Sequence, residues 1–212
     1  PSVADTGDSS ASPEVTVPLA FTEAPALKIN EHGAGLTAWL ELQTTEPTTL
    51  TIEVVDPRGS RVWSVDTLAT LHRELLLGFR PDADHTVTVT AHAASTSVGS
   101  GPMPWRSEPL PADTPEFVVT GDPGRMEPGV TLFKVAFHLF MVDAEGEVVW
   151  FADAAALTHQ VGVTPRGTVL YNAGQSLIQE IAPSGEVLRS WVSTPAPPLP
   201  DAIDVALPVF NH

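Results

Sequence analysis

The chain has 212 residues, a net charge of −16, only 10 basic residues and no cysteine. So few Lys and Arg side chains argue against a nucleic-acid ligand and against an anionic membrane surface, because both need cationic groups on the protein. The lack of Cys excludes disulfides and thiolate metal sites in this chain, and no apolar run approaches the roughly 20 residues that span a bilayer.

Residues 1–17 are small, polar and acidic, without apolar periodicity. This composition predicts a flexible tether. The chain begins at Pro1 and not at Met, so we expect that an upstream segment such as an export signal is removed. A lipoprotein Cys just before Pro1 would anchor such a tether, and a plain disordered tail fits equally well. We therefore expect an exported bacterial protein, in the periplasm or at the cell surface or outside the cell.

Residues 18–111 are predicted to form one all-β domain. Thr and Val are frequent, and Pro-rich and Gly-rich turn signals separate short runs of alternating apolar and polar residues. One face of each run is apolar and the other carries Thr, Glu and His, as in a half-buried antiparallel sheet. The spacing fits a sandwich of seven strands: Ala26–Ile29, Leu36–Gln43, Leu50–Val55, Arg61–Val65, Arg73–Leu77, Thr86–His92 and Trp105–Leu110.

Two stretches of this domain, GLTAWLELQTTEPTTLTIEVVD and HRELLLGFRPDADHTVTVTAHA, resemble a fibronectin type III domain. The resemblance rests on Trp39 in the second strand and on the run from Leu76 to His85, in which His85 stands where the family usually has Tyr. It implies a binding or spacer module and nothing sharper, because such sandwiches host many functions. His85 and His92 lie seven residues apart on one strand and face opposite sides, so they cannot share a metal ion.

Residues 112–128 hold turn signals around Phe117–Thr120, which we expect to be the first strand of the next domain. Residues 129–212 contain a repeat. The segments HLFMVDAEGEVVWFAD and SLIQEIAPSGEVLRSW each place a tight turn between two alternating strands, with Gly146 and Gly185 39 residues apart at its end. The stretch THQVGVTPRGTVLY adds two strands around a Pro-Arg-Gly turn. Hairpins repeated at a period near 40 indicate the first one to two blades of a β-propeller.

A Gly-x-Thr-Leu-Phe start at residues 129–133 is followed by Met-Val-Asp, by Glu-Gly-Glu-Val-Val-Trp, by THQVGVTPRGTVLY and by IQEIAPSGEVLRSW. This series is similar to the arylsulfotransferase (aryl-sulfate sulfotransferase) family. The resemblance implies an N-terminal sandwich followed by a six-bladed propeller. It also implies an enzyme that moves a sulfuryl group from a phenolic sulfate ester to another phenol, without a nucleotide donor or other cofactor. In that family a channel histidine takes the group, and further His and Arg side chains bind its oxygens.

Two histidines are the candidate catalytic residues. By the resemblance, His212 matches the first channel histidine after the Pro-rich connector, with a role in sulfate binding or proton transfer. His159 begins the innermost strand of the preceding blade, where its side chain would face the channel, although a structural hydrogen-bonding role is the simpler interpretation. No metal site is predicted.

The repeated hairpins also carry packing expectations. We expect Val148 and Trp150 to point inward on the outgoing strand of the first hairpin, and Val187 to do the same in the second. The Trp behind each turn is expected to pack between blades. Asp143 and Glu147 flank the first turn and are predicted to be solvated.

A propeller needs roughly four to eight blades to close. We therefore expect the partner of this chain to be the C-terminal remainder of the same protein, in one chain or as a cleaved one. The leading hypothesis is the N-terminal region of an exported arylsulfotransferase-like protein, inactive by itself because the nucleophile lies in the missing part. The alternative is a non-catalytic cell-surface protein used for binding or assembly. A third hypothesis is a structural fragment that associates with its own C-terminal half.

Overall fold

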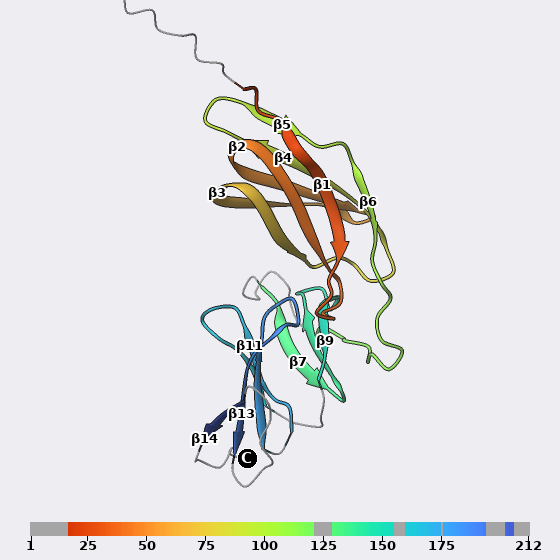
Figure 1. The fold of residues 1–212 in the computed structure, drawn as a ribbon. Coiled ribbons are helices and arrows are strands. Elements are labelled where there is room, and N and C mark those ends of the chain that lie inside the picture. Colours follow the sequence, from red (N-terminus) through yellow and green to blue (C-terminus); the bar gives the residue numbers. More distant parts are fainter. Residues whose placement is uncertain (1–16, 121–128, 155–159, 175, 194–201, 206–212) are drawn as a thin grey trace, which may run out of the picture.

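The computed structural model describes residues 17–120, 129–154, 160–174 and 176–193, and the backbone of residues 202–205. Within these ranges every regular element is a β-strand, which confirms the predicted all-β class. None of the described residues belongs to a helix long and apolar enough to cross a membrane. Two regions follow one another in Figure 1: the N-terminal region, residues 17–111, and the repeat region, residues 129–205.

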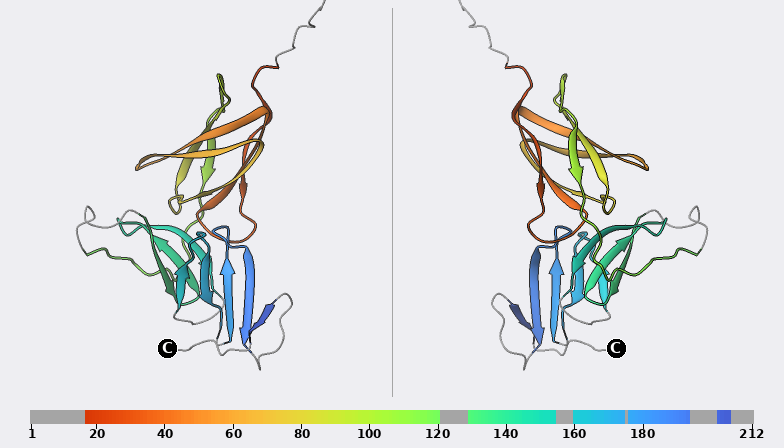
Figure 2. Two further views of the ribbon diagram at one scale, coloured as in Figure 1. Left: turned by 90° about the vertical axis from the view of Figure 1, so that its left-hand side faces the viewer. Right: turned by 90° about the vertical axis from the view of Figure 1, so that its right-hand side faces the viewer.

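The N-terminal region is a curled six-stranded sheet (Figures 1 and 2). The first half of β2 pairs with β1 and with the end of β3, and its second half pairs with β4 and with the start of β3. The register shifts between Gln43 and Leu50, where the sheet bends, so its two halves lie on opposite sides of one core. The strands are β1 (Phe21–Ile29), β2 (Thr37–Asp56), β3 (Gly59–Leu77), β4 (Asp84–His92), β5 (Ser97–Gly99) and β6 (Met103–Arg106).

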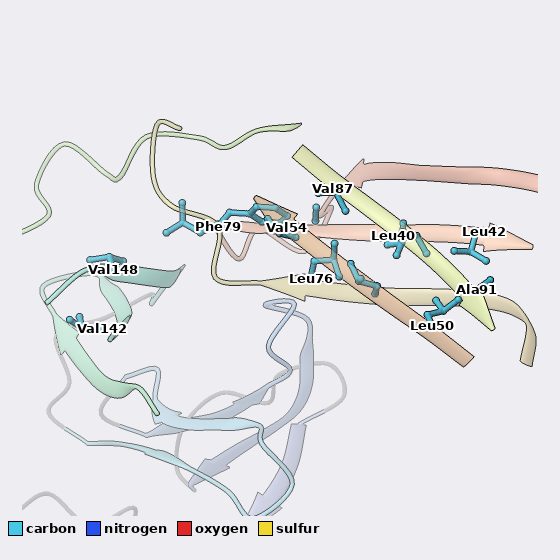
Figure 3. Packing of buried hydrophobic residues seen from close by; sticks show 14 of the residues in the cluster. Leu40, Leu42, Leu50, Val54, Leu76, Phe79, Val87, Ala91, Val142 and Val148 are labelled. Carbon is cyan, nitrogen blue, oxygen red and sulfur yellow. The ribbon is translucent and has the colours of Figure 1, made fainter. Parts of the chain in front are cut away.

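Alternating burial along β2 and β4 builds that core (Figure 3). Leu40 and Leu50, from the two halves of β2, are both fully buried and belong to one cluster. Burying a side chain of this size stabilises the fold by about 1.5–3 kcal/mol. The same cluster continues into the repeat region through Val142 and Val148, and Phe79 lies at the end of the core that faces them. The two regions therefore share apolar packing.

The strand boundaries differ from the sequence prediction in one systematic way. Four predicted strands merge pairwise into two long ones: Leu36–Gln43 with Leu50–Val55 in β2, and Arg61–Val65 with Arg73–Leu77 in β3. Thr44 Oγ1 donates to the Glu46 carbonyl at 2.7 Å, and Thr48 Oγ1 lies 3.2 Å from Nε2 of the buried His72. These hydroxyls satisfy polar groups where the ladder is interrupted, so the bend does not open into a loop.

Two other predicted strands are wrong, one in its bounds and one altogether. The predicted strand Trp105–Leu110 shares only its first two residues with β6, which begins at Met103 and ends at Arg106. Just beyond the end of β6, the Glu108 carboxylate accepts the Leu36 backbone N–H at 2.6 Å. Phe117–Thr120 belongs to no strand.

Phe117 holds its segment by ring packing instead. Its ring centroid lies 5.6 Å from those of Phe133 and Phe140, which are paired across the strands Thr131–Val135 and His138–Val142. Contacts between aromatic rings therefore hold this connection without a backbone ladder.

The repeat region holds two sheets (Figure 2). The first sheet consists of β7 (Thr131–Val135), β8 (His138–Val142) and β9 (Val148–Asp153). The second sheet consists of β10 (Val161–Val163), β11 (Val169–Asn172), β12 (Leu177–Ile181), β13 (Val187–Ser193) and β14 (Ala202–Val205). Strands β10 to β13 are antiparallel in chain order, and β14 runs parallel to β13. The strands β8 and β12, and likewise β9 and β13, begin 39 residues apart, so the period seen in the sequence is kept in space.

Three turns of the repeat region share one geometry: residues 143–147, 164–168 and 182–186. In each, the first N–H donates to the fifth carbonyl and the fourth N–H donates to the first carbonyl, at 2.8–3.1 Å. The fourth residue is Gly146, Gly167 or Gly185, with φ of 87°, 77° and 90° respectively. Glycine takes this left-handed conformation without steric cost, which explains its place at the end of every turn.

The packing expectations for the outgoing strands are met in one hairpin and not in the other. Val148 is 4 % exposed and Trp150 is 2 % exposed, as predicted. The prediction for Val187 is wrong, because this side chain is 50 % exposed. Val148 joins the core shared with the N-terminal region, whereas neither core cluster of the described residues includes Val187.

Candidate functional site

The two predicted catalytic histidines, His159 and His212, lie outside the described residues. The site is therefore built from the groups that the described strands bring together. They form two clusters: the junction between the two regions, and a histidine–carboxylate group at the far end of the first sheet.

Backbone contacts dominate the first part of the junction. The Gly35 N–H donates to the Phe151 carbonyl at 2.7 Å, and a Cβ on Gly35 would lie only 2.1 Å from the Phe151 ring. The buried Asn30 Nδ2 donates to the Ser184 carbonyl at 2.7 Å. A Cβ on Gly185 would lie 2.7 Å from a backbone oxygen of the N-terminal region. The hairpins β8–β9 and β12–β13 therefore both pack directly against the loop that precedes β2.

Ion pairs form the second part of the junction. Arg80 Nη1 lies 2.7 Å from Asp143 Oδ2, and Arg58 Nη2 lies 2.7 Å from Glu147 Oε1. The hydrogen bond to Glu147 raises the pKa of Arg58. Arg61, beside Asp56 at 3.1 Å, has its pKa lowered by burial. Three of the chain's 10 basic residues are thus concentrated on one edge of the N-terminal region.

The prediction that Asp143 and Glu147 are solvated is wrong for Asp143, whose side chain is only 15 % exposed. Its Oδ1 accepts hydrogen bonds from the backbone N–H groups of Glu145 and Glu147 at 3.1 and 2.9 Å. Its Oδ2 accepts a hydrogen bond from the Arg80 guanidinium. One carboxylate therefore holds the turn and ties it to the N-terminal region. The sequence carried no signal for this pair, because its partners are 63 residues apart.

The second cluster centres on His138, at the start of β8. Its Nδ1 lies 3.0 Å from Asp153 and its Nε2 lies 3.2 Å from Asp113. A small cavity of about 370 Å³ opens beside it, walled by Phe137, His138, Asp153, Ala154 and Tyr171. Burial raises the pKa of the Tyr171 hydroxyl, which donates to Gln179 at 2.8 Å.

Both ring nitrogens of His138 face carboxylates, so the imidazole has no lone pair directed at a substrate. The arrangement ties the 112–120 segment to the first sheet and does not present a nucleophile. Among the described residues, no group of three or more His, Cys, Asp or Glu side chains is arranged to hold a metal ion.

Two further histidines are placed as the sequence predicted, on opposite faces of β4. His85 is buried, its Nδ1 lies 3.1 Å from the Ala83 carbonyl, and its Nε2 accepts the Arg80 N–H at 3.0 Å. Burial lowers the pKa of this imidazole. His92 lies on the other face, with Nε2 3.0 Å from Thr51 Oγ1.

The chain matches no protein-family model and no curated protein. The fold itself defines the class: an all-β protein in which a curled N-terminal sheet packs against two sheets that repeat at a spacing of 39 residues.

Proposed function

We propose that residues 1–212 are the N-terminal region of an exported arylsulfotransferase-like protein, in which a fibronectin III-like sandwich precedes the first blades of a six-bladed propeller. One observation carries the proposal. The hairpins β8–β9 and β12–β13 repeat with the same turn at a 39-residue spacing, within the stretch that resembles the family. The antiparallel order β10 to β13 is what a four-stranded blade requires.

The strand order of the N-terminal region supports the sandwich part. One layer holds β1, the first half of β2 and the end of β3, and the other holds the remaining halves with β4 and β6. Trp39 does not support it, because its ring lies on the outer face, where the Arg73 guanidinium stacks 4.1 Å from its centre. The resemblance of this region therefore rests on strand order and on the run that ends at His85.

The proposed sulfuryl transfer uses the imidazole side chain of histidine as the nucleophile. A neutral imidazole is a competent nucleophile near neutral pH, and Arg and His donors stabilise charge on sulfate and phenolate oxygens. In this proposal His212 binds sulfate or transfers a proton, and His159 faces the channel. The nucleophilic histidine and the arginine belong to the C-terminal remainder of the protein.

The test is an assay with a chromogenic aryl sulfate and a phenol acceptor. We expect transfer by the full-length protein, none by the chain 1–212, and loss of transfer in full-length His212→Ala. The matched control is His92→Ala, which removes a histidine from the surface of β4 and should leave transfer unchanged. Transfer by the chain 1–212, or a full-length protein without activity, would overturn the proposal.

A non-catalytic scaffold is the second candidate, and the junction favours it. Two ion pairs, shared apolar packing and backbone hydrogen bonds fix the two regions to each other, as a spacer that presents a binding surface would need. This candidate replaces the first if the full-length protein folds but lacks transfer with every aryl sulfate tried.

A further inference from the structure

The connector, residues 112–120, links the two regions and lies against the first sheet. Phe117 packs on aromatic rings of that sheet. The Thr114 N–H donates to the Pro111 carbonyl at 3.0 Å, a bond between neighbouring residues that does not reach the sheet. Among the described residues, the contact of Asp113 with His138 is the one ion pair between the connector and the first sheet. This contact is therefore the polar link that holds the first half of the connector.

Both nitrogens of the His138 ring have a carboxylate oxygen as their partner. Nε2 lies 3.2 Å from Asp113 Oδ1, and Nδ1 lies 3.0 Å from Asp153 Oδ1. An ionised carboxylate only accepts hydrogen bonds, and a neutral imidazole carries a single N–H. The two contacts can therefore both be hydrogen bonds only when the ring is protonated on both nitrogens.

Loss of one proton leaves a ring lone pair facing a carboxylate, so one of the two contacts has to open. Asp153 is held opposite His138 by the ladder between β8 and β9. Asp113 lies in a turn outside any strand, and its side chain is 57 % exposed. The connector is therefore the partner that moves away from the neutral ring.

A second observation shows that the connector is held incompletely at this point. The hydroxyl of Thr114, next to Asp113, is buried and has no hydrogen-bond partner among the described residues. A buried hydroxyl without a partner is costly, and water satisfies it once the connector detaches. The change of one hydrogen bond at Asp113 therefore acts on a segment that already gains hydration by opening.

We propose that His138, Asp113 and Asp153 form a pH-dependent clasp, in which the protonated imidazole holds the connector on the first sheet and the neutral imidazole releases it. Because the closed arrangement needs the second proton, the clasp is closed at low pH. It opens as the pH rises through the range of about 5 to 8, where histidine side chains lose that proton. The clasp is independent of the sulfuryl chemistry and serves a non-catalytic scaffold equally.

Two further titratable side chains stand near His138. Tyr171 of β11 shares the wall of its cavity, and burial raises the pKa of this hydroxyl above its ordinary 10.0, so it stays neutral while the clasp opens. Lys134 of β7 lies beside the turn that leads into β8, with Nζ 3.4 Å from the Ala136 carbonyl, and burial lowers its pKa. Lys134 is therefore the neighbouring cation whose own titration has to be separated from that of His138.

A nitroxide spin label on the connector tests the clasp. The chain has no Cys, so Ala112→Cys gives a single labelling site beside Asp113. We expect the mobile fraction of this label to be severalfold larger at about pH 8 than at about pH 5.5. A label at Thr67→Cys, an exposed position on β3, is the control and should be equally mobile at both. Equal mobility of the connector label at the two pH values, or greater mobility at the lower one, would overturn the proposal.

Substitutions in the labelled protein identify the titrating group. In Asp113→Asn the side-chain amide can accept from the protonated ring and donate to the neutral ring, so the label should stay immobile at both pH values. Asp113→Ala should leave it mobile at both, and Lys134→Gln should keep the original pH dependence. A pH dependence that persists in Asp113→Asn, or disappears in Lys134→Gln, would overturn the clasp by assigning the change to another group.

Discussion

The hairpins β8–β9 and β12–β13 have the same turn and the same spacing, but they differ in what covers them. In the first hairpin Val148 and Trp150 are both fully buried, whereas in the second Val187 is exposed and Trp191 is half-buried. The first hairpin contributes side chains both to the core shared with the N-terminal region and to the apolar cluster between the two sheets of the repeat region. Among the described residues, the second hairpin contributes only to the latter, through Leu177 and Ile181. Burial in the two hairpins is therefore set by the segments that pack against each of them and not by the local sequence.

Their turns also attach to the N-terminal region by different chemistry. The first turn begins with Asp143, which pairs with Arg80. The second begins with Ala182 and presents only backbone, through the Ser184 carbonyl and the tight approach of Gly185. One turn geometry therefore supports an ionic contact in the first hairpin and a close backbone contact in the second. Three pairs of substitutions test this difference.

Trp150→Ala should have the largest effect, because it removes a fully buried indole together with its hydrogen bond to Pro183. We expect a loss of about 3–5 kcal/mol in the free energy of unfolding. Trp191→Ala in the same chain is the matched control and should cost clearly less. Urea unfolding followed by circular dichroism measures both, and equal losses would show that the two hairpins are equally covered.

Gly185→Ala is the second test, with Gly167→Ala as its control. Both glycines have φ in the left-handed region, but an added Cβ meets backbone at 2.7 Å only at Gly185 and finds open space at Gly167. We expect a loss of about 1–2 kcal/mol at Gly167 from the backbone alone, and about 1–3 kcal/mol more at Gly185 from overpacking. Thermal unfolding of the two variants measures both losses. A smaller loss of stability at Gly185 than at Gly167 would mean that the turn at residues 182–186 does not pack against the N-terminal region.

Val148→Ala and Val187→Ala compare one repeat position in two environments. Truncation at Val148 opens a cavity in the shared core and should cost about 2 kcal/mol. The same change at Val187 alters an exposed side chain and should stay within about 0.5 kcal/mol. Unfolding of both variants at the same urea concentration would contradict the difference in burial between Val148 and Val187.

The smallest effect is a pH dependence that belongs to the N-terminal region and to neither hairpin. Burial lowers the pKa of His85 in the folded state below its ordinary value of 6.5. As the pH falls below that value, the unfolded chain therefore binds a proton at His85 before the folded chain does. Stability should therefore fall with pH below 6.5, by about 1 kcal/mol or less per pH unit.

His85→Gln is the control for this effect, because its amide can accept the Arg80 N–H and donate to the Ala83 carbonyl without titrating. Unfolding curves at a series of pH values should show a shallower decline in this variant. An unchanged slope would assign the acid sensitivity to a group other than His85.

Much of the strand and turn pattern was predictable from the sequence. Alternation of apolar side chains marked most strands, and the left-handed glycines of the turns at 143–147 and 182–186 were recognisable from their place after polar residues. The 39-residue spacing predicted which strands would be equivalent. These properties depend on backbone sterics and on neighbours within a few residues, so the local sequence carries them.

Tertiary structure alone decided the rest. It merged four predicted strands into β2 and β3, turned Trp39 outward beneath Arg73, and joined Arg58 to Glu147 across 89 residues of chain. It also buried Val148 and left Val187 exposed, although both follow the same Gly-Glu. Burial and pairing depend on which distant segment comes to lie against a residue, and no local pattern of side chains contains that information.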